Sequence, residues 1–537
     1  MKLQRFFVPL YLLTLLCTGL GYLAILPAFE GFDETAHYSS IRQIADTATI
    51  PIYGKSFIDR EVADYRGPLP YTSLAPPYDD GLTYAKFFAD PPLTADYLTH
   101  YRQSTLQPPY SASDQQNWQA QHPPLYYILL APIEKAASQL PLVTRIFILR
   151  LVSFLMALTG VAFGLLASRN PQLPLKSDPA VIGFLFYPLI LPMFFPEFTR
   201  IGNDSLCLLL VGITAFLLSK YLKDESDRKL PVALGVTLGL GLLTKAFFLP
   251  ITAALAIFLS VRIACKSGTR SGRWKNLLLI LLPALIIGGG WYIYKFMAFG
   301  TVIGSNDAIN LANQGGLISN LKQNFSLYGI VRGLTVTFVS YSWAGTWSLT
   351  RLPIFLHLPV LGLAAWGFGS YLFQIKRRPL TDPAWLPALL FGIFGIGFLY
   401  HVIISVAING NGNTPGWYLH ILMPWVAPAL GAGFYALFQN PRTKFFLIIL
   451  LLYAFAFQTI AIWAQFTLFT GCATKSNEKY YAFSGHTLCL DQIPLLFDRL
   501  SFLGLPSLAI AGFSGGIICA LLLLALWKKP HLVNKLG

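Results

Sequence analysis

The chain of 537 residues is 55% hydrophobic and only 12% charged, with a mean hydropathy of +0.56. One aqueous globule cannot bury that much apolar surface, so the composition excludes a soluble protein and makes a lipid bilayer the main solvent. The formal net charge of +15 would suit either a nucleic acid partner or a membrane topology signal, and the placement of the basic residues decides between the two.

Lysine and arginine are concentrated in seven short segments that we place in the cytoplasm. These segments hold 21 of the 39 basic residues within 65 positions, whereas the first long loop, residues 30–144, holds seven in 115 positions. The segments are residues 1–5, 169–179, 220–230, 262–276, 376–383, 440–444 and 528–537. This asymmetry follows the positive-inside rule and argues against nucleic acid as a partner.

The predicted spans begin with residues 6–29, an apolar run behind Lys2 and Arg5 that lacks a clear cleavage site. It predicts an uncleaved first helix and a cytoplasmic amino terminus. Eleven more runs of spanning length follow, at 145–168, 179–196, 204–222, 230–244, 246–264, 277–299, 354–375, 384–408, 417–438, 445–468 and 506–527. We therefore predict an all-α polytopic membrane protein of about 12 transmembrane helices, with both termini in the cytoplasm.

One further apolar stretch, residues 122–141, could be mistaken for a span. Counting it would move the basic segments outside, so we assign it to a helix that lies in the outer membrane interface. It belongs to the extracytoplasmic loop 30–144, whose many prolines favour turns and short interfacial helices. We divide the chain into a first module, residues 1–300, that includes this loop, and a second module, residues 301–537.

The second module has two extracytoplasmic loops, residues 300–353 and 469–505. Cys472 and Cys489 both lie in the later loop, where an oxidising compartment would permit a disulfide between them. The other four cysteines lie in apolar spans or at the cytoplasmic end of one, where we expect them to be inert.

The first chemical motif, Gly31 to Tyr38, follows the first span and reads GFDETAHY. If Asp33 caps a helix that begins at Glu34, His37 projects from the same side one turn later. The pattern fits a simple helix cap, a catalytic carboxylate, or a metal site of Asp33, Glu34 and His37. For the metal site, no further ligand stands at a diagnostic spacing.

Three later motifs add cations. His122 is followed by two prolines and the aromatic pair Tyr126 and Tyr127, a pattern that also suits an interfacial anchor. Arg200 and Asp204 stand at the outer end of two spans, where they could simply pair. Lys245 separates two apolar helices without an obvious partner in the sequence, and a snorkelling lysine is the alternative there.

These motifs converge, because the topology places Asp33, His122, Arg200 and Lys245 on the same external face. A carboxylate with several cations beside lipid suits a substrate whose leaving group is a phosphate embedded in the membrane. The cations would hold the phosphate and stabilise its developing charge. The carboxylate would take a proton from an incoming hydroxyl.

The order of these motifs resembles the GT-C superfamily of membrane glycosyltransferases. The similarity rests on Asp33 and Glu34 after the first helix, the HPPL stretch from His122, Arg200 with Asp204, and the LTK stretch that ends at Lys245. Within the superfamily, the sequence is most similar to the protein O-mannosyltransferases and the lipid A aminoarabinose transferases. The likeness covers about the first 300 residues.

The resemblance implies a role for each matching residue. Asp33 would be the general base and Glu34 its orienting neighbour. Lys245, His122 and Arg200 would bind the donor phosphate, and His37, Asp204 and Tyr126 would support the site. The position of His37, one residue later than in the mannosyltransferases, argues against naming mannose as the sugar.

The implied reaction is an inverting transfer of one sugar from a polyprenyl-phosphate carrier to a hydroxyl of a glycan, lipid or protein. It would take place on the outer face of a bacterial cytoplasmic membrane, among membrane lipids. No cofactor is required, since the donor arrives already activated on its lipid, and a divalent metal is compatible with the site but not implied by it.

Two rival functions predict other charge distributions. A transporter or a flippase for lipid-linked glycans would carry charges near the bilayer midplane of pseudo-symmetric halves, whereas here the charges lie at the membrane faces. A ligase that moves a whole oligosaccharide from a lipid pyrophosphate would be expected to use a large late loop, and residues 469–505 are too few. The transferase hypothesis requires Asp33 and Lys245 to share one cavity.

Overall fold

The structure is a computed structural model that describes residues 2–68, 82–106, 108–168, 177–265, 270–343, 345–348, 352–473 and 489–527. The expected cytoplasmic segment 528–537 and most of segment 169–179 lie outside these residues. The described chain is almost entirely helical. Its two strands, β1 (Phe57–Asp59) and β2 (Ala112–Gln116), pair antiparallel within the first loop, with Phe57 opposite Gln116.

Within the described residues, ten helices are long and apolar enough to cross a membrane. They are α1 (Lys2–Ile25), α7 (Leu142–Ser168), α10 (Asp204–Lys223), α12 (Phe248–Cys265), α13 (Arg270–Phe299), α17 (Ile354–Ile375), α18 (Trp385–Asn409), α19 (Met423–Phe438) with the preceding turn η3 (Gly416–Leu422), α20 (Pro441–Phe469) and α22 (Pro506–Trp527). Two shorter apolar helices, α8 (Ser177–Ile190) and α11 (Lys229–Leu242), occupy the other two expected spans. The prediction of an all-α polytopic membrane protein is confirmed.

The first loop folds into short helices around α2 (Glu34–Thr47). The others are α3 (Arg60–Ala63), α4 (Tyr84–Phe88), α5 (Pro91–Tyr97), the turns η1 (Leu98–Gln103) and η2 (Trp118–Gln121), and α6 (Leu125–Ala136). Helix α6 forms most of the ambiguous apolar stretch and packs against α2. Its 12 residues extend about 18 Å, well short of a hydrocarbon core about 30 Å thick. It is therefore not a span, in agreement with the charge distribution.

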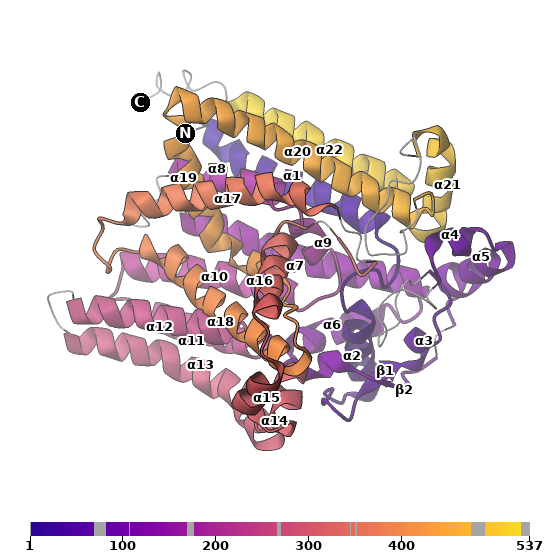
Figure 1. The fold of residues 1–537 in the computed structure, drawn as a ribbon, viewed down its shortest axis with the longest axis horizontal. Coiled ribbons are helices and arrows are strands. Elements are labelled where there is room, and N and C mark those ends of the chain that lie inside the picture. The colour runs from indigo at the N-terminus through magenta and orange to yellow at the C-terminus, as the bar shows by residue number, and fades with distance from the viewer. Residues whose placement is uncertain are drawn as a thin grey trace.

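Most first-loop elements lie at the right-hand end of the helical bundle in Figure 1, with α21 (Ile493–Leu503) above them. The second-loop helices α14 (Asn306–Asn313) and α15 (Gly316–Asn324) lie at the bottom of the view, and α16 (Leu327–Tyr341) and α9 (Phe194–Phe198) lie near its centre. The turn η4 (Leu490–Gln492) directly precedes α21. The amino end of α1 and the carboxyl end of α22 lie at the opposite, left-hand end of the bundle.

Small residues allow the long helices to approach closely, as is usual in membranes. Helices α7 and α10 meet at Gly160 and Gly212, where a Cβ on Gly212 would lie 2.1 Å from the Gly160 carbonyl oxygen. Helices α1 and α22 run antiparallel, with a Cβ on Gly512 only 2.5 Å from the Gly21 nitrogen. This antiparallel pair brings the amino end of α1 and the carboxyl end of α22 to the same side of the bundle.

A buried ionic network anchors the first loop to α7. Arg145 lies 2.9 Å from Glu61 and 2.5 Å from Glu134, and Arg42 lies 3.1 Å from Asp59. Both arginines are almost fully buried. Because unpaired buried charges are costly, the network holds α2, α3, α6 and α7 in one arrangement.

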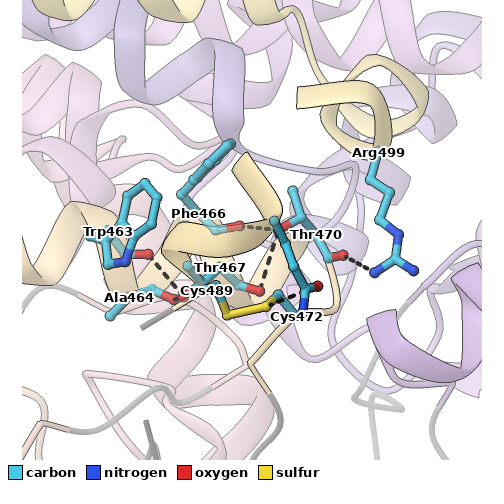
Figure 2. The surroundings of a disulfide bond; sticks show 9 residues. Trp463, Ala464, Phe466, Thr467, Thr470, Cys472, Cys489 and Arg499 are labelled. Atoms are coloured by element: carbon cyan, nitrogen blue, oxygen red, sulfur yellow. Dashed lines mark hydrogen bonds between the residues drawn. A yellow bond between two sulfur atoms is a disulfide. The ribbon is translucent and has the colours of Figure 1, made fainter. Parts of the chain in front are cut away.

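A disulfide between Cys472 and Cys489 joins the end of α20 to the start of η4 (Figure 2). Nearby, the Arg499 guanidinium donates a hydrogen bond to the Thr470 carbonyl at 3.0 Å. Together these contacts fasten α21 to α20 on the loop-bearing side of the bundle.

Candidate active site

A cavity of about 600 Å³ opens among the loops, and Asp33, His122 and Lys245 all line it. Asp33 comes from the turn before α2, His122 from the loop before α6, and Lys245 from the turn between α11 and α12. The structure thus brings together three of the predicted site residues from segments more than 80 positions apart. Phe394 and Tyr418 also line the cavity, so the second half of the chain contributes to the same site.

Asp33 directs its carboxylate away from α2. Its backbone is left-handed, with φ at 58°, and its side chain makes no capping bond to the helix. Instead Oδ1 accepts a hydrogen bond from Trp118 Nε1 at 2.8 Å. Left-handed backbone at a non-glycine residue costs about 1–3 kcal/mol and is maintained where the surrounding structure holds it. Asp33 therefore occupies the N-cap position of α2, but its side chain does not cap the helix. Burial raises the pKa of Asp33 even though Trp118 opposes the shift.

Lys245 has a partner that the local sequence did not reveal. Its ammonium lies 2.8 Å from Asp204 Oδ1 and 2.9 Å from Oδ2, and 4.4 Å from the ring centroids of Phe247 and Tyr418. The side chain is buried at 6% exposure, so the snorkelling alternative is wrong. An ammonium has three N–H donors, and the bonds to Asp204 leave one for the cavity.

Arg200 does not reach the cavity wall. Its guanidinium lies 2.6 Å from Glu197 and 3.1 Å from Asp204, and donates a third bond to the Phe32 carbonyl at 2.9 Å. Because its donors face protein acceptors, Arg200 is not among the groups that line the cavity, and the expected phosphate contact stays a prediction. In this arrangement Arg200 fixes Asp204 behind Lys245 and Phe32 next to Asp33. Asp204 pairs with both cations, and its expected supporting role stays a prediction as well.

Glu34 also faces away from the cavity. Its Oε2 lies 2.5 Å from Arg150 Nη2, and Oε1 accepts bonds from Arg150 Nε at 2.7 Å and from the Ile201 amide at 2.9 Å. The Gly31 amide donates to Oε2 at 3.0 Å. Every carboxylate oxygen is engaged and the residue is 1% exposed, so Glu34 does not line the cavity, and its expected role as the neighbour that orients Asp33 stays a prediction. Glu34 braces the turn that carries Asp33.

The two histidines form a layered pair. The rings of His37 and His122 are nearly parallel, with centroids 6.5 Å apart, and only His122 lines the cavity. His37 Nδ1 lies 2.9 Å from the Tyr127 hydroxyl, which holds the ring behind the wall. Burial lowers the pKa of both imidazoles well below the usual range. A neutral His122 offers the cavity a hydrogen-bond donor and not a full charge.

Tyr126, for which a supporting role is predicted, is fully buried. Its hydroxyl lies 2.7 Å from Ser153 Oγ and accepts a hydrogen bond from the Gly202 amide at 2.9 Å. These bonds join α6 to α7 and to the turn next to Arg200. The alternative metal site of Asp33, Glu34 and His37 does not form, and the described part of the chain contains no group of three His, Cys, Asp or Glu placed to hold a metal ion.

Sequence reasoning missed the polar rim of the cavity, where the first and second loops meet. Tyr53 donates a short hydrogen bond to Asn306 Oδ1, and the Asn306 amide donates to Gln121 Oε1 at 2.7 Å. Gln116 and Asp307 line the same rim. Clustered amides and carboxylates in an otherwise apolar chain were the signal that could have identified it.

Sequence reasoning also did not identify the residues of the apolar wall, which α12 and α18 build. On α18, Phe394, Gly397, Phe398 and His401 recur at helical spacing and line the cavity, so one face changes from apolar to polar along the helix. Phe247, just before α12, packs against Phe394 with ring centroids 5.8 Å apart. The cavity therefore has an apolar wall, a cationic side and a polar rim.

The fold and the cavity define a multi-pass membrane protein with an amphipathic site among its loops. The chain belongs to the family of predicted membrane proteins described as DUF2142, whose model matches residues 16–374. A search of curated protein sequences gave no match.

Among solved structures, the chain is similar to ArnT from Cupriavidus metallidurans bound to undecaprenyl phosphate. The identity is 14% and the TM-score 0.46, over 96% of this chain and 76% of that one. It is also similar to the oligosaccharyltransferase AglB from Archaeoglobus fulgidus in complex with an inhibitory peptide and a dolichol-phosphate. There the identity is 11% and the TM-score 0.41, over 86% of this chain and 55% of that one. Similarity at this level leaves the chemistry to be argued from the site.

Proposed function

We propose that the protein is an inverting glycosyltransferase that moves a sugar from a polyprenyl-phosphate carrier to a hydroxyl acceptor. The observation that carries this proposal is that Asp33 and Lys245 line one cavity that also has an apolar wall. A general base, a phosphate-binding cation and a surface for a lipid tail are the three elements that such a reaction needs.

The donor lies with its polyprenyl chain against the apolar wall of α12 and α18. Its phosphate takes the remaining N–H of Lys245 and an N–H of His122. Within the Glu197, Arg200, Asp204 and Lys245 cluster, the Lys245 ammonium is the group that lines the cavity. An ammonium there favours a phosphate over a neutral head group.

The transfer is a single displacement. Asp33 takes the proton of the acceptor hydroxyl while that oxygen bonds to the anomeric carbon of the sugar. The bond between the anomeric carbon and the phosphate oxygen breaks, and the phosphate leaves on its lipid with the added negative charge held by Lys245 and His122. Attack from the face opposite the leaving group inverts the anomeric centre. Trp118 holds the Asp33 carboxylate in place, and the raised pKa makes it a stronger base than an exposed aspartate.

The acceptor, a hydroxyl of a glycan, lipid or protein, enters past the polar rim formed by Tyr53, Gln121 and Asn306. In this proposal the rim faces the outside of a bacterial cytoplasmic membrane and both termini lie in the cytoplasm. The charge asymmetry of the loops and the antiparallel packing of α1 on α22 support that orientation.

The test begins with the lipid that copurifies with the detergent-extracted protein, which mass spectrometry should identify as a polyprenyl-phosphate sugar. That donor is then supplied to the protein in reconstituted membranes. We expect Asp33→Asn to reduce transfer by about 10²- to 10⁴-fold without weakening donor binding, and Lys245→Ala to weaken binding of undecaprenyl phosphate. The exposed Asp114, outside the cavity, provides the control Asp114→Asn.

Two results would reject the proposal. One is full turnover by Asp33→Asn together with unchanged affinity of Lys245→Ala for undecaprenyl phosphate. The other is movement of an intact lipid-linked sugar across the membrane without any release of free carrier, which would identify a flippase.

A further inference from the structure

A second, smaller cavity lies apart from the candidate active site and shares no lining residue with it. Its volume is about 190 Å³, and it lies where the outer ends of α1 and α7 meet the turn between α21 and α22. The residues that line it are Leu23, Ala24, Leu26, Ala28, Arg102, Val143, Thr144, Ile146, Phe147, Arg150, Leu503, Gly504 and Leu505. Thr144 and Leu505 are exposed, so the cavity opens to the surface of the protein.

The wall of this second cavity is apolar except for Thr144 and two arginines, Arg102 and Arg150. The two arginines differ in their partners. Arg150 is paired with Glu34 and also donates to the Leu26 and Pro27 carbonyls. Arg102, from η1, donates a single hydrogen bond to the Gly504 carbonyl at 3.3 Å. No carboxylate of the described residues lies within ion-pair distance of Arg102. Among the described residues, the cavity therefore holds one positive charge, that of Arg102, without a paired carboxylate against an apolar wall.

The depth of the cavity matches that of a lipid head group. Helix α1 ends at Ile25, α7 begins at Leu142 and α22 begins at Pro506, so three spans reach the loop-bearing side of the bundle at this point. Lipid phosphates lie at the boundary between the hydrocarbon core and the polar layer, which is where apolar helices end. A guanidinium at that level forms bidentate bonds to a phosphate.

We infer that this cavity binds the phosphate of an anionic phospholipid. The cavity, of about 190 Å³, is far smaller than a whole phospholipid, so only the phosphate and part of its glycerol enter it. The acyl chains extend into the bilayer past the exposed Leu505. The inference does not rest on the proposed function, since the ligand is a membrane constituent and the site lies outside the reacting cavity.

The experiment is native mass spectrometry of the full-length protein titrated with phosphatidylglycerol or with phosphatidylcholine. We expect one phosphatidylglycerol to bind at least tenfold more tightly than phosphatidylcholine, and Arg102→Gln to abolish that preference. Arg60→Gln is the matched control. Like Arg102, Arg60 donates one hydrogen bond to a backbone carbonyl, that of Ala112 at 3.2 Å, but it does not line the cavity. A melting curve verifies that both variants remain folded.

Equal binding of the two lipids by the wild type would overturn the inference, as would a preference that survives in Arg102→Gln or disappears in Arg60→Gln. Two further arms distinguish other sources of phosphate. If inorganic phosphate at equal concentration displaces the phosphatidylglycerol, or if undecaprenyl phosphate binds this site more tightly, the site is not one for anionic phospholipid. The inference is supported if Arg102→Gln, and not Arg60→Gln, loses the preference for phosphatidylglycerol, and if neither inorganic phosphate nor undecaprenyl phosphate competes for the site.

Discussion

Asp204 accepts bonds from Lys245 Nζ at 2.8 and 2.9 Å, although 41 positions separate the two residues in the chain. The same carboxylate lies 3.1 Å from Arg200. One buried acid thus holds two cations, one of which faces the cavity while the other supports the turn beside Asp33. The geometry of the cationic side of the site depends on this single carboxylate.

Replacing Asp204 should therefore destabilise the fold. Asp204→Asn leaves Arg200 and Lys245 with less negative charge, and breaking a buried ion pair costs about 3–5 kcal/mol. Thermal unfolding in detergent measures the effect. The control is Asp382→Asn, which removes a partly exposed partner of Arg378 at 3.2 Å and should cost at most about 1 kcal/mol. Equal melting temperatures for Asp204→Asn and the control would contradict the role of Asp204.

The pH dependence of transfer should report the raised pKa of Asp33. A general base acts only when deprotonated, so transfer should be lost as the pH falls through that pKa, at a higher pH than an ordinary aspartate near 3.9 would give. The pH profile of kcat/KM measures this acid limb. In Asp114→Asn the limb should not move. A limb at the position of an unperturbed aspartate would contradict the assignment of Asp33 as base.

The raised pKa of Asp33 also predicts that the protein loses stability as the pH rises. An ordinary salt-bridged aspartate, with a lowered pKa, has the opposite effect. Because the pKa of Asp33 is higher in the folded than in the unfolded state, the folded state holds the proton more tightly. Ionisation therefore lowers stability as the pH rises through this range. Asp33→Asn, which tolerates left-handed backbone, should melt above wild type at pH 7, and the difference should shrink in acid. A variant that melts below wild type at both pH values would be inconsistent with this account.

Glu34 should behave as a positioning residue. Glu34→Gln keeps the shape of the side chain but removes the charge that compensates Arg150, so we expect a lower melting temperature. The affinity for undecaprenyl phosphate and the acid limb of the pH profile should stay as in wild type, because Glu34 does not line the cavity. If Glu34→Gln kept wild-type stability but shifted the acid limb of the kcat/KM profile, Glu34 would have to act in catalysis itself.

The disulfide gives a further stability prediction. Cys472 and Cys489 close a loop with a sequence separation of 17, for which a cross-link contributes about 3 kcal/mol when the whole fold melts as a unit. Reduction should lower the melting temperature of wild type and leave that of Cys472→Ser unchanged. A wild-type melting temperature that is insensitive to reductant would show that this loop opens independently of the bundle.

The sequence by itself determined the helical membrane fold, and it predicts the external face for the site. In a bilayer every backbone polar group must be satisfied within the chain, so apolar runs of spanning length become helices and the basic segments between them set their direction. It also indicated Asp33, His122 and Lys245, because polar residues at the ends of apolar helices are costly unless they have a use.

Only the tertiary structure decided which of these polar groups face the cavity. Asp33 and Glu34 are adjacent in the chain, yet the left-handed backbone of Asp33 and the distant Arg150 turn their carboxylates in different directions. Arg200 pairs with its sequence neighbours Glu197 and Asp204, as the sequence allowed. The long-range pairs of Glu34 with Arg150 and of Asp204 with Lys245 leave no periodic trace in the sequence, because a buried charge is satisfied by whichever partner the packing of the helices brings to it.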